Sequence, residues 1–208
     1  MVNEAKEAGA FVRRKIGWLL NSKNESATRA MLAKLRRGIG KPPGSMPDLW
    51  PFTLDGLPES LGGKTGGPTK GEWAVHTALT LFALHQQGKD LGKSCMHQEG
   101  AALGISTHRL VERPEEEDRI KRRFDAVATS QAPEEFAHHL RGIIQLLKDK
   151  GIPLDYSALT EDLYRFQFPE ARDTVRLRWG RDFYRTANQE NKSQGNVVEG
   201  KDEHHENE

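Results

Sequence analysis

Apolar side chains recur along this chain at the spacing of an α-helix, and the alternation typical of a β-strand is almost absent. In one stretch, Phe136, Leu140, Ile143 and Leu147 fall on a single helical face. Comparable stripes predict helices over residues 9–20, 26–37, 72–87, 133–151, 156–166 and 170–186, and over a segment that follows Pro114. The predicted fold class is therefore all-α, a single bundle of about seven helices.

A long irregular connection, rich in glycine and proline, occupies residues 38–71 between the second and third predicted helices. Four of its apolar side chains are expected to pack onto the bundle in short turns: Leu49, Trp50, Phe52 and Leu54. The sequence GGKTGGPTKG at 62–71 is expected to be a mobile surface loop. It does not predict a phosphate-binding loop, because Pro58 stands where that motif has its first glycine and no strand precedes it.

The C-terminal segment differs in composition from the rest of the chain. From Glu190 to Glu208 it holds six acidic and two basic residues, with no aromatic residue and no periodicity. Such segments bury too little apolar surface to fold. We therefore predict one helical domain over residues 1–187 and a disordered acidic tail over 188–208. Because the tail carries −4 of a total charge of +1, the remainder carries +5.

The sequence contains no pattern that predicts catalysis, a cofactor or a metal site. His76 and His85 lie nine residues apart, which places them on opposite sides of one helix, and neither HExxH nor CxxC occurs. The single cysteine, Cys95, fits a reducing compartment, and no apolar run is typical of a signal peptide or a membrane-spanning helix. We expect a non-enzymatic cytoplasmic protein with no cofactor and no membrane partner. A metal-dependent helical hydrolase is kept as an alternative.

Positive charge is concentrated where acidic residues are missing. No Asp or Glu occurs between Ser26 and Pro47, and five basic residues form a first cluster there: Arg29, Lys34, Arg36, Arg37 and Lys41. The helix dipole alone favours basic residues near a helix C-terminus, which explains Arg36 and Arg37 but not Arg29. Clustered arginine also matches phosphate geometry, so we predict nucleic-acid contact at the first cluster.

A second cluster of basic residues follows Pro114 and has flanking members on either side. It comprises Arg119, Lys121, Arg122 and Arg123, with Arg109 and Arg113 upstream and Arg141 on the next predicted helix. We predict nucleic-acid contact here too. Pairing with the acids Glu115 to Asp118, one turn earlier, stays open as an alternative. The arginines of the last predicted helix alternate with Asp173 and Asp182, and are expected to form an ordinary salt-bridged surface.

Three stretches of the sequence together resemble the CasB family, the small subunit of the type I-E CRISPR Cascade complex. They are RAMLAKLRRGIGKPPGSMPDLWPF, the central AVHTALTLFALHQQG, and a C-terminal stretch that begins RRFDAVATSQAPEEFAHHLRG and ends VRLRWGRDFYR. The resemblance covers about residues 11–186 in the same order and spacing. The loop at 62–71 and the acidic tail depart from the family pattern.

The resemblance implies an all-α subunit without enzymatic activity, present as two copies stacked head to tail among the other Cascade subunits. Its expected partners are crRNA and target DNA, which it would contact through the backbone to stabilise the R-loop and the displaced strand. The positions that match basic residues of the family are Arg29, Arg36, Arg37, Lys121, Arg122, Arg123 and Arg141. A helical adaptor whose arginines dock on acidic protein surfaces is the other hypothesis.

Overall fold

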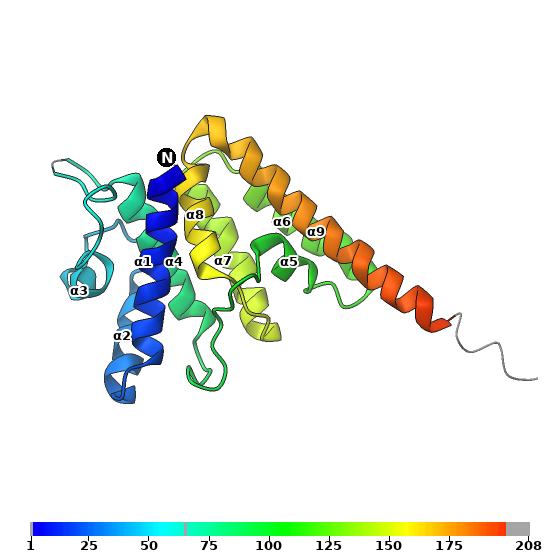
Figure 1. The fold of residues 1–208 in the computed structure, drawn as a ribbon, viewed down its shortest axis with the longest axis horizontal. Coiled ribbons are helices and arrows are strands. Elements are labelled where there is room, and N and C mark those ends of the chain that lie inside the picture. Colours follow the sequence, from blue (N-terminus) through cyan, green and yellow to red (C-terminus); the bar gives the residue numbers. More distant parts are fainter. Residues whose placement is uncertain (1, 65, 199–208) are drawn as a thin grey trace, which may run out of the picture.

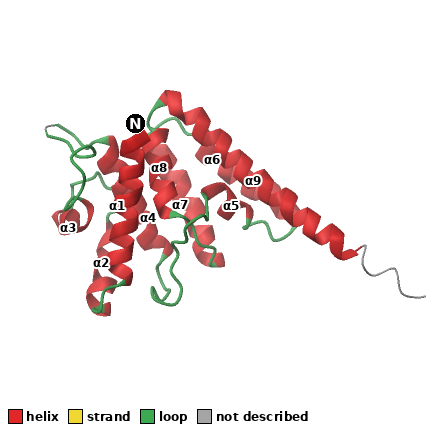
Figure 2. Cartoon of the chain, in the orientation of Figure 1, coloured by secondary structure: helices red, strands yellow, loops and turns green. Residues whose placement is uncertain are grey.

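The chain folds into helices joined by loops (Figure 1; Figure 2). The computed structural model describes residues 2–64 and 66–198. Within these ranges there is no strand, and there are nine α-helices and two short 3-10 helices: α1 (Val2–Leu20), α2 (Glu25–Arg37), η1 (Pro47–Leu49), α3 (Trp50–Thr53), α4 (Lys70–His85), α5 (Leu103–His108), η2 (Pro114–Glu116), α6 (Glu117–Thr129), α7 (Pro133–Lys150), α8 (Tyr156–Phe166) and α9 (Pro169–Val198). The all-α prediction is confirmed.

Local sequence signals set the ends of the long helices. α4 begins with a capping box, because the Thr69 hydroxyl accepts from the Glu72 backbone N–H while the Glu72 carboxylate accepts from the Thr69 N–H. Asp155 caps α8, as its position predicts, by accepting two backbone N–H groups of the first turn at 3.0 Å each. α7 ends at Gly151, whose φ of 67° is the left-handed conformation that glycine adopts without strain.

α4 lies at the centre of one half of the molecule, with α1, α2, α7 and α8 packed against it (Figure 1). The other half consists of α5, α6 and α9, in which α5 packs on α9 while α6 packs on α7. A stack of Phe136, Phe166 and Trp179, with ring centroids 4.5 to 5.7 Å apart, joins the two halves. The buried apolar residues form one continuous core, as a single bundle requires.

Helix α5 was not predicted, because six residues give too few turns to show a helical period. It packs closely on α9 through Gly104, where an added Cβ would collide with the carbonyl oxygen of Trp179. α1 also begins at Val2, well before the predicted start at residue 9. In both cases tertiary packing stabilises a segment whose own periodicity is weak.

The prediction for the apolar segment after α2 is right for Leu49 and Phe52, which are 1% and 3% exposed. It is wrong for Trp50, which is 48% exposed. The Trp50 indole N–H donates to the Gly44 carbonyl at 2.8 Å, so the ring lies against its own loop instead of entering the core.

α9 extends to Val198, past residue 188 where the acidic tail was predicted to begin. Residues 199–208 lie outside the described part of the chain, so the disorder of the tail stays a prediction there. Among the described helices, none is both long enough and apolar enough to cross a membrane.

Candidate nucleic-acid interface

The basic residues of α2 lie on two flanks of the helix, because Thr28, Leu32 and Leu35 face the core. Arg29 and Arg36 lie on the same flank, as their spacing predicts, and both line a cavity of about 600 Å³ that also includes Lys89 from the loop after α4. On the other flank, Lys34 and Arg37 point toward Asp48 of η1. The first cluster is therefore divided into two separate surfaces.

Two carboxylates lie near the first cluster in spite of the acid-free sequence. Asp48 has a carboxylate oxygen 3.9 Å from Lys34 Nζ and 3.8 Å from an Arg37 nitrogen, and Glu25 lies 3.6 Å from Arg29. The idea that this segment is wholly uncompensated is thus wrong for these three residues. Their side chains are 40% to 76% exposed, and exposed pairs of this kind contribute about 0–1 kcal/mol. They leave the cations available to a ligand.

Most of the predicted contact residues have no such partner. Within the described residues no carboxylate lies within 4.0 Å of the following: Arg36, Lys41, Arg109, Arg113, Lys121, Arg122, Arg123 and Arg141. The acids at the start of α6 neutralise only one member of the second cluster, since Arg119 contacts Glu116 at 3.0 Å. Arg122 instead donates to the backbone carbonyl of Asp118 at 3.2 Å.

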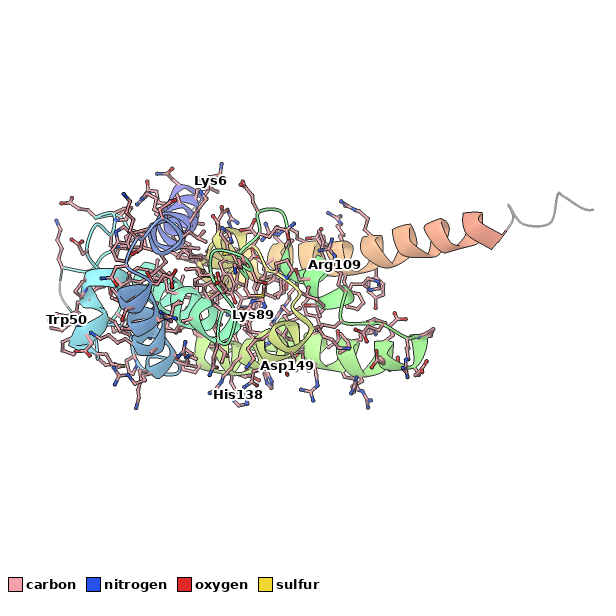
Figure 3. The ribbon with its side chains drawn as sticks, turned by 90° about the horizontal axis from the view of Figure 1, so that it is seen from below. Lys6, Trp50, Lys89, Arg109, His138 and Asp149 are labelled. Atoms are coloured by element: carbon pink, nitrogen blue, oxygen red, sulfur yellow. The ribbon has the colours of Figure 1, made fainter. Side chains whose placement is uncertain are left out.

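The structure brings together two residues that the sequence assigned to different clusters. Lys41, after α2, and Arg141, on α7, both line a groove of about 610 Å³ between these elements and α4. Arg109 ends α5 in the other half of the molecule, at a distance from this groove (Figure 3). α2, α7 and α6 lie in a row along one side, opposite α1 and α9 (Figure 3). Lys89, Lys70 and His138 also line these cavities and were missed, because isolated residues give no cluster signal.

Three arginines of α9 contact neighbouring elements, and only Arg176 of these three forms the salt bridge within α9 that the sequence predicts. Arg172 donates to the Phe166 carbonyl at 3.1 Å and to the Gln131 side chain at 2.8 Å. Arg176 donates to the Ala128 carbonyl in the last turn of α6 and to the Ser130 carbonyl after it, and pairs with Asp173 at 3.1 Å. Arg178 pairs with the buried Asp162. These contacts fix α9 to its neighbours, so we do not count these residues as part of the interface.

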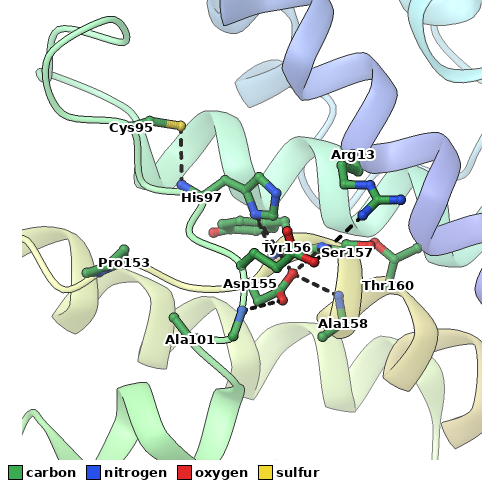
Figure 4. A network of polar contacts seen from close by, with 12 residues as sticks. Arg13, Cys95, His97, Ala101, Pro153, Asp155, Tyr156, Ser157, Ala158 and Thr160 are labelled. Carbon is green, nitrogen blue, oxygen red and sulfur yellow. Dashed lines mark hydrogen bonds and ion pairs between the residues drawn. The ribbon is translucent and has the colours of Figure 1, made fainter.

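Two histidines, the buried His85 and the half-buried His97, and the cysteine take part in structural contacts. Burial lowers the pKa of His85 to about 4, and its Nδ1 lies 3.1 Å from the Tyr156 hydroxyl. His97 Nδ1 accepts from the Tyr156 backbone N–H at 3.1 Å, and Asp155 accepts from the Gly100 N–H at 2.9 Å (Figure 4). Burial raises the pKa of the Cys95 thiol, which disfavours the reactive thiolate. Among the residues placed by the structure, no three His, Cys, Asp or Glu side chains converge as metal ligands would.

Both the sequence and the fold are similar to known proteins. A family model described as CRISPR-associated protein Cse2 matches residues 31–184. The crystal structure of CasB from Thermobifida fusca has 33% sequence identity and a TM-score of 0.71, covering 85% of this chain and 97% of that one. The crystal structure of M. ruber CasB, at 24% identity, has a TM-score of 0.63 with 89% and 97% covered, and shows the same fold. A comparison with curated proteins gives no match.

Proposed function

This chain belongs to the Cse2 (CasB) family of CRISPR-associated proteins, subunits of the type I-E Cascade complex, and from this premise we propose that it holds nucleic-acid backbone within that complex. The subunit we propose is non-catalytic. It contacts crRNA and target DNA through arginine and lysine side chains and stabilises the R-loop and the displaced strand. We assign this activity to residues 1–187, with the acidic tail as a separate segment.

The observation that carries the proposal is a set of exposed or half-buried cations on helices along one side of the molecule. Arg36, Lys41, Arg141, Lys121 and Arg123 come from α2 and the segment after it, from α7 and from α6, and none has a carboxylate within 4.0 Å among the described residues. Figure 3 shows these helices in a row. Unpaired cations carried by such a row of helices would match the repeating charge of a phosphate backbone.

The expected affinity of the isolated subunit is low. Three or four phosphate contacts give a log-log salt slope of about −3, and non-specific binding of this kind has a Kd of about 10⁻⁴ to 10⁻⁶ M. Inside a complex the same contacts act at a high effective concentration, so weak contacts become useful. Because they are made to phosphate, base pairing with the guide selects the sequence.

The test removes the charge of Arg36, together with that of its neighbour Arg37, from the subunit in the assembled complex. We expect Arg36→Ala with Arg37→Ala to weaken target binding and R-loop formation at physiological salt, and to make the salt slope shallower by about 1–2 because up to two phosphate contacts are lost. The matched control is Lys6→Ala with Arg14→Ala, which removes two exposed charges from α1, on the opposite side (Figure 3). Equal effects of the two double variants, or no effect of either, would contradict the proposal.

The adaptor hypothesis gives a different result in the same experiment. If Arg36 and Arg37 dock on an acidic protein surface, their removal lowers incorporation of the subunit into the complex and leaves the salt slope unchanged. Side chains that suit a protein contact lie elsewhere, since Trp18 on α1 and Trp50 on α3 are 58% and 48% exposed. We propose that contacts with other Cascade subunits and with a second copy use such surfaces. Trp18→Ala should then reduce the copy number in purified complex.

A further inference from the structure

The groove between the segment after α2, the start of α4 and the start of α7 is the feature with the most unexplained chemistry. Its volume of about 610 Å³ lies in the range of small-ligand sites. Pro42, Pro43 and the half-buried Trp73 contribute rigid apolar surface to its lining. A site that only attracted phosphate groups would not need this surface.

Cations from three different elements surround the apolar lining. Lys41 follows α2, Lys70 begins α4 and Arg141 lies on α7, whereas Glu134 is the one carboxylate among the described residues that line the groove. α7 starts beside the groove at Pro133 without a side-chain cap, so the positive end of its dipole adds to the field. The groove therefore favours an anionic ligand.

His76, in the lining of the groove, has a ring nitrogen, Nδ1, without a hydrogen-bond partner in the described part of the chain. Its ring is 4% exposed, and its Nε2 lies 3.0 Å from the Gly38 carbonyl. The Lys41 carbonyl also lies near the ring, and Nδ1 is a buried atom without a hydrogen-bond partner among the described residues. Burial lowers the pKa of His76, so the ring is neutral at pH near 7 and Nε2 carries the proton that Gly38 accepts. Nδ1 is then an unsatisfied acceptor, but it is buried beneath the lining and does not face a ligand in the groove.

A negative group and a flat, largely apolar body occur together in a nucleotide. A base inside a duplex is stacked on both sides and cannot enter a groove, whereas a base of an unpaired strand can leave its neighbours at small cost. We propose that this groove takes one nucleotide of a single strand, with its base against the apolar lining and its phosphate between Lys41 and Arg141. The inference rests on the proposed function and specifies which form of nucleic acid this surface recognises.

The first experiment fills the groove without changing its charge. The full chain is titrated with a single-stranded oligothymidylate and with a duplex of the same length. Ala137→Trp, in the groove lining, should weaken single-strand binding at least about fivefold, the loss expected for one stacked base, and leave duplex binding unchanged. Ala30→Trp makes the same substitution at an exposed position of α2 outside the groove and should change neither. Glu134→Gln should tighten single-strand binding, because it removes the opposing charge.

The second experiment needs no variant. A single strand with one photoreactive 4-thiothymidine is crosslinked to the wild-type chain, and we expect the modified peptides to come from residues 39–43, 68–81 and 133–141. Crosslinks elsewhere, or normal single-strand binding by a folded Ala137→Trp variant, would overturn the inference. So would an Ala137→Trp variant that binds oligonucleotide normally but no longer joins the complex, since a protein segment would then occupy the groove. If Ala137→Trp does not weaken single-strand binding while Arg36→Ala with Arg37→Ala still weakens target binding, the inference about the groove is wrong and the proposed function stands.

Discussion

Replacing Gly104 with alanine should displace α5 from α9. The added Cβ would collide with the carbonyl oxygen of Trp179 and would lie 2.8 Å from Asp182 Cβ and 2.9 Å from the Phe183 backbone nitrogen. These atoms are fixed in the backbone of α9 or directly attached to it, so no side-chain rotation relieves the contact. Overpacking of this kind costs about 1–3 kcal/mol. In a chain of this size each kcal/mol shifts Tm by about 2–4 °C, so we expect Gly104→Ala to lower Tm by about 2–12 °C.

Gly180→Ala is the matched control, because it makes the same substitution on α9 next to Trp179. Nothing lies within 4 Å of the Cβ that it would add. Alanine is about 0.5–1 kcal/mol better than glycine inside a helix, so this variant should raise Tm slightly. Both values come from thermal unfolding followed by far-UV circular dichroism. If Gly104→Ala unfolds at the wild-type temperature, or if both variants are destabilised equally, the close α5–α9 contact does not hold α5 in position.

Two further predictions concern charge. Asp48→Asn removes the carboxylate that lies 3.9 Å from Lys34 and 3.8 Å from Arg37. DNA binding by the complex should then tighten, and its log-log salt slope should steepen by up to about 2. An unchanged slope would show that neither cation contacts phosphate. Burial lowers the pKa of His85 from 6.5 to about 4. Below pH 6.5 the unfolded chain therefore takes up a proton that the folded chain does not, and the free energy of unfolding decreases as the pH is lowered. This residue lowers the free energy of unfolding by about 2 kcal/mol at about pH 5. The Tm of His85→Gln should therefore change less than that of wild type between about pH 7 and pH 5. Parallel profiles of Tm against pH would contradict this assignment.

The parts of the fold that were predicted correctly are those with a local physical cause. The stripe from Phe136 to Leu147 gives α7, and Asp155 caps α8 at the predicted position. α5 was missed because its six residues are held by the close approach of Gly104 to α9, a contact that depends on the tertiary fold. Trp50 was wrongly assigned to the core because hydrophobicity alone does not show that Gly44 offers its indole a hydrogen-bond acceptor.

The geometry of the candidate interface was likewise predicted correctly where the sequence signal is local and incorrectly where it depends on the tertiary fold. The helical spacing of Arg29 and Arg36 was enough to place both on one flank, where they line one cavity. The approach of Asp48 to Lys34 and Arg37 depends on how the connection after α2 folds back, and the sequence gives no local signal for it. The meeting of Lys41 with Arg141 likewise requires α2 and α7 to pack on the same central helix.

The distribution of ion pairs bears on how such a surface works inside a complex. A fully unpaired cluster would bind any polynucleotide and would slow the search for a target, because non-specific affinity grows with each phosphate contact. Here Arg29, Lys34, Arg37 and Arg119 each have one carboxylate at 3.0 to 3.9 Å, of which Glu25 and Asp48 are exposed and Glu116 is half-buried. In the proposed function, such pairs would be weak enough to exchange their carboxylate for a phosphate of the guide–target duplex, and strong enough to reduce attraction for free nucleic acid. Arg36, Lys41 and Arg141 have no such competitor in the described structure and are the residues whose loss should affect binding most.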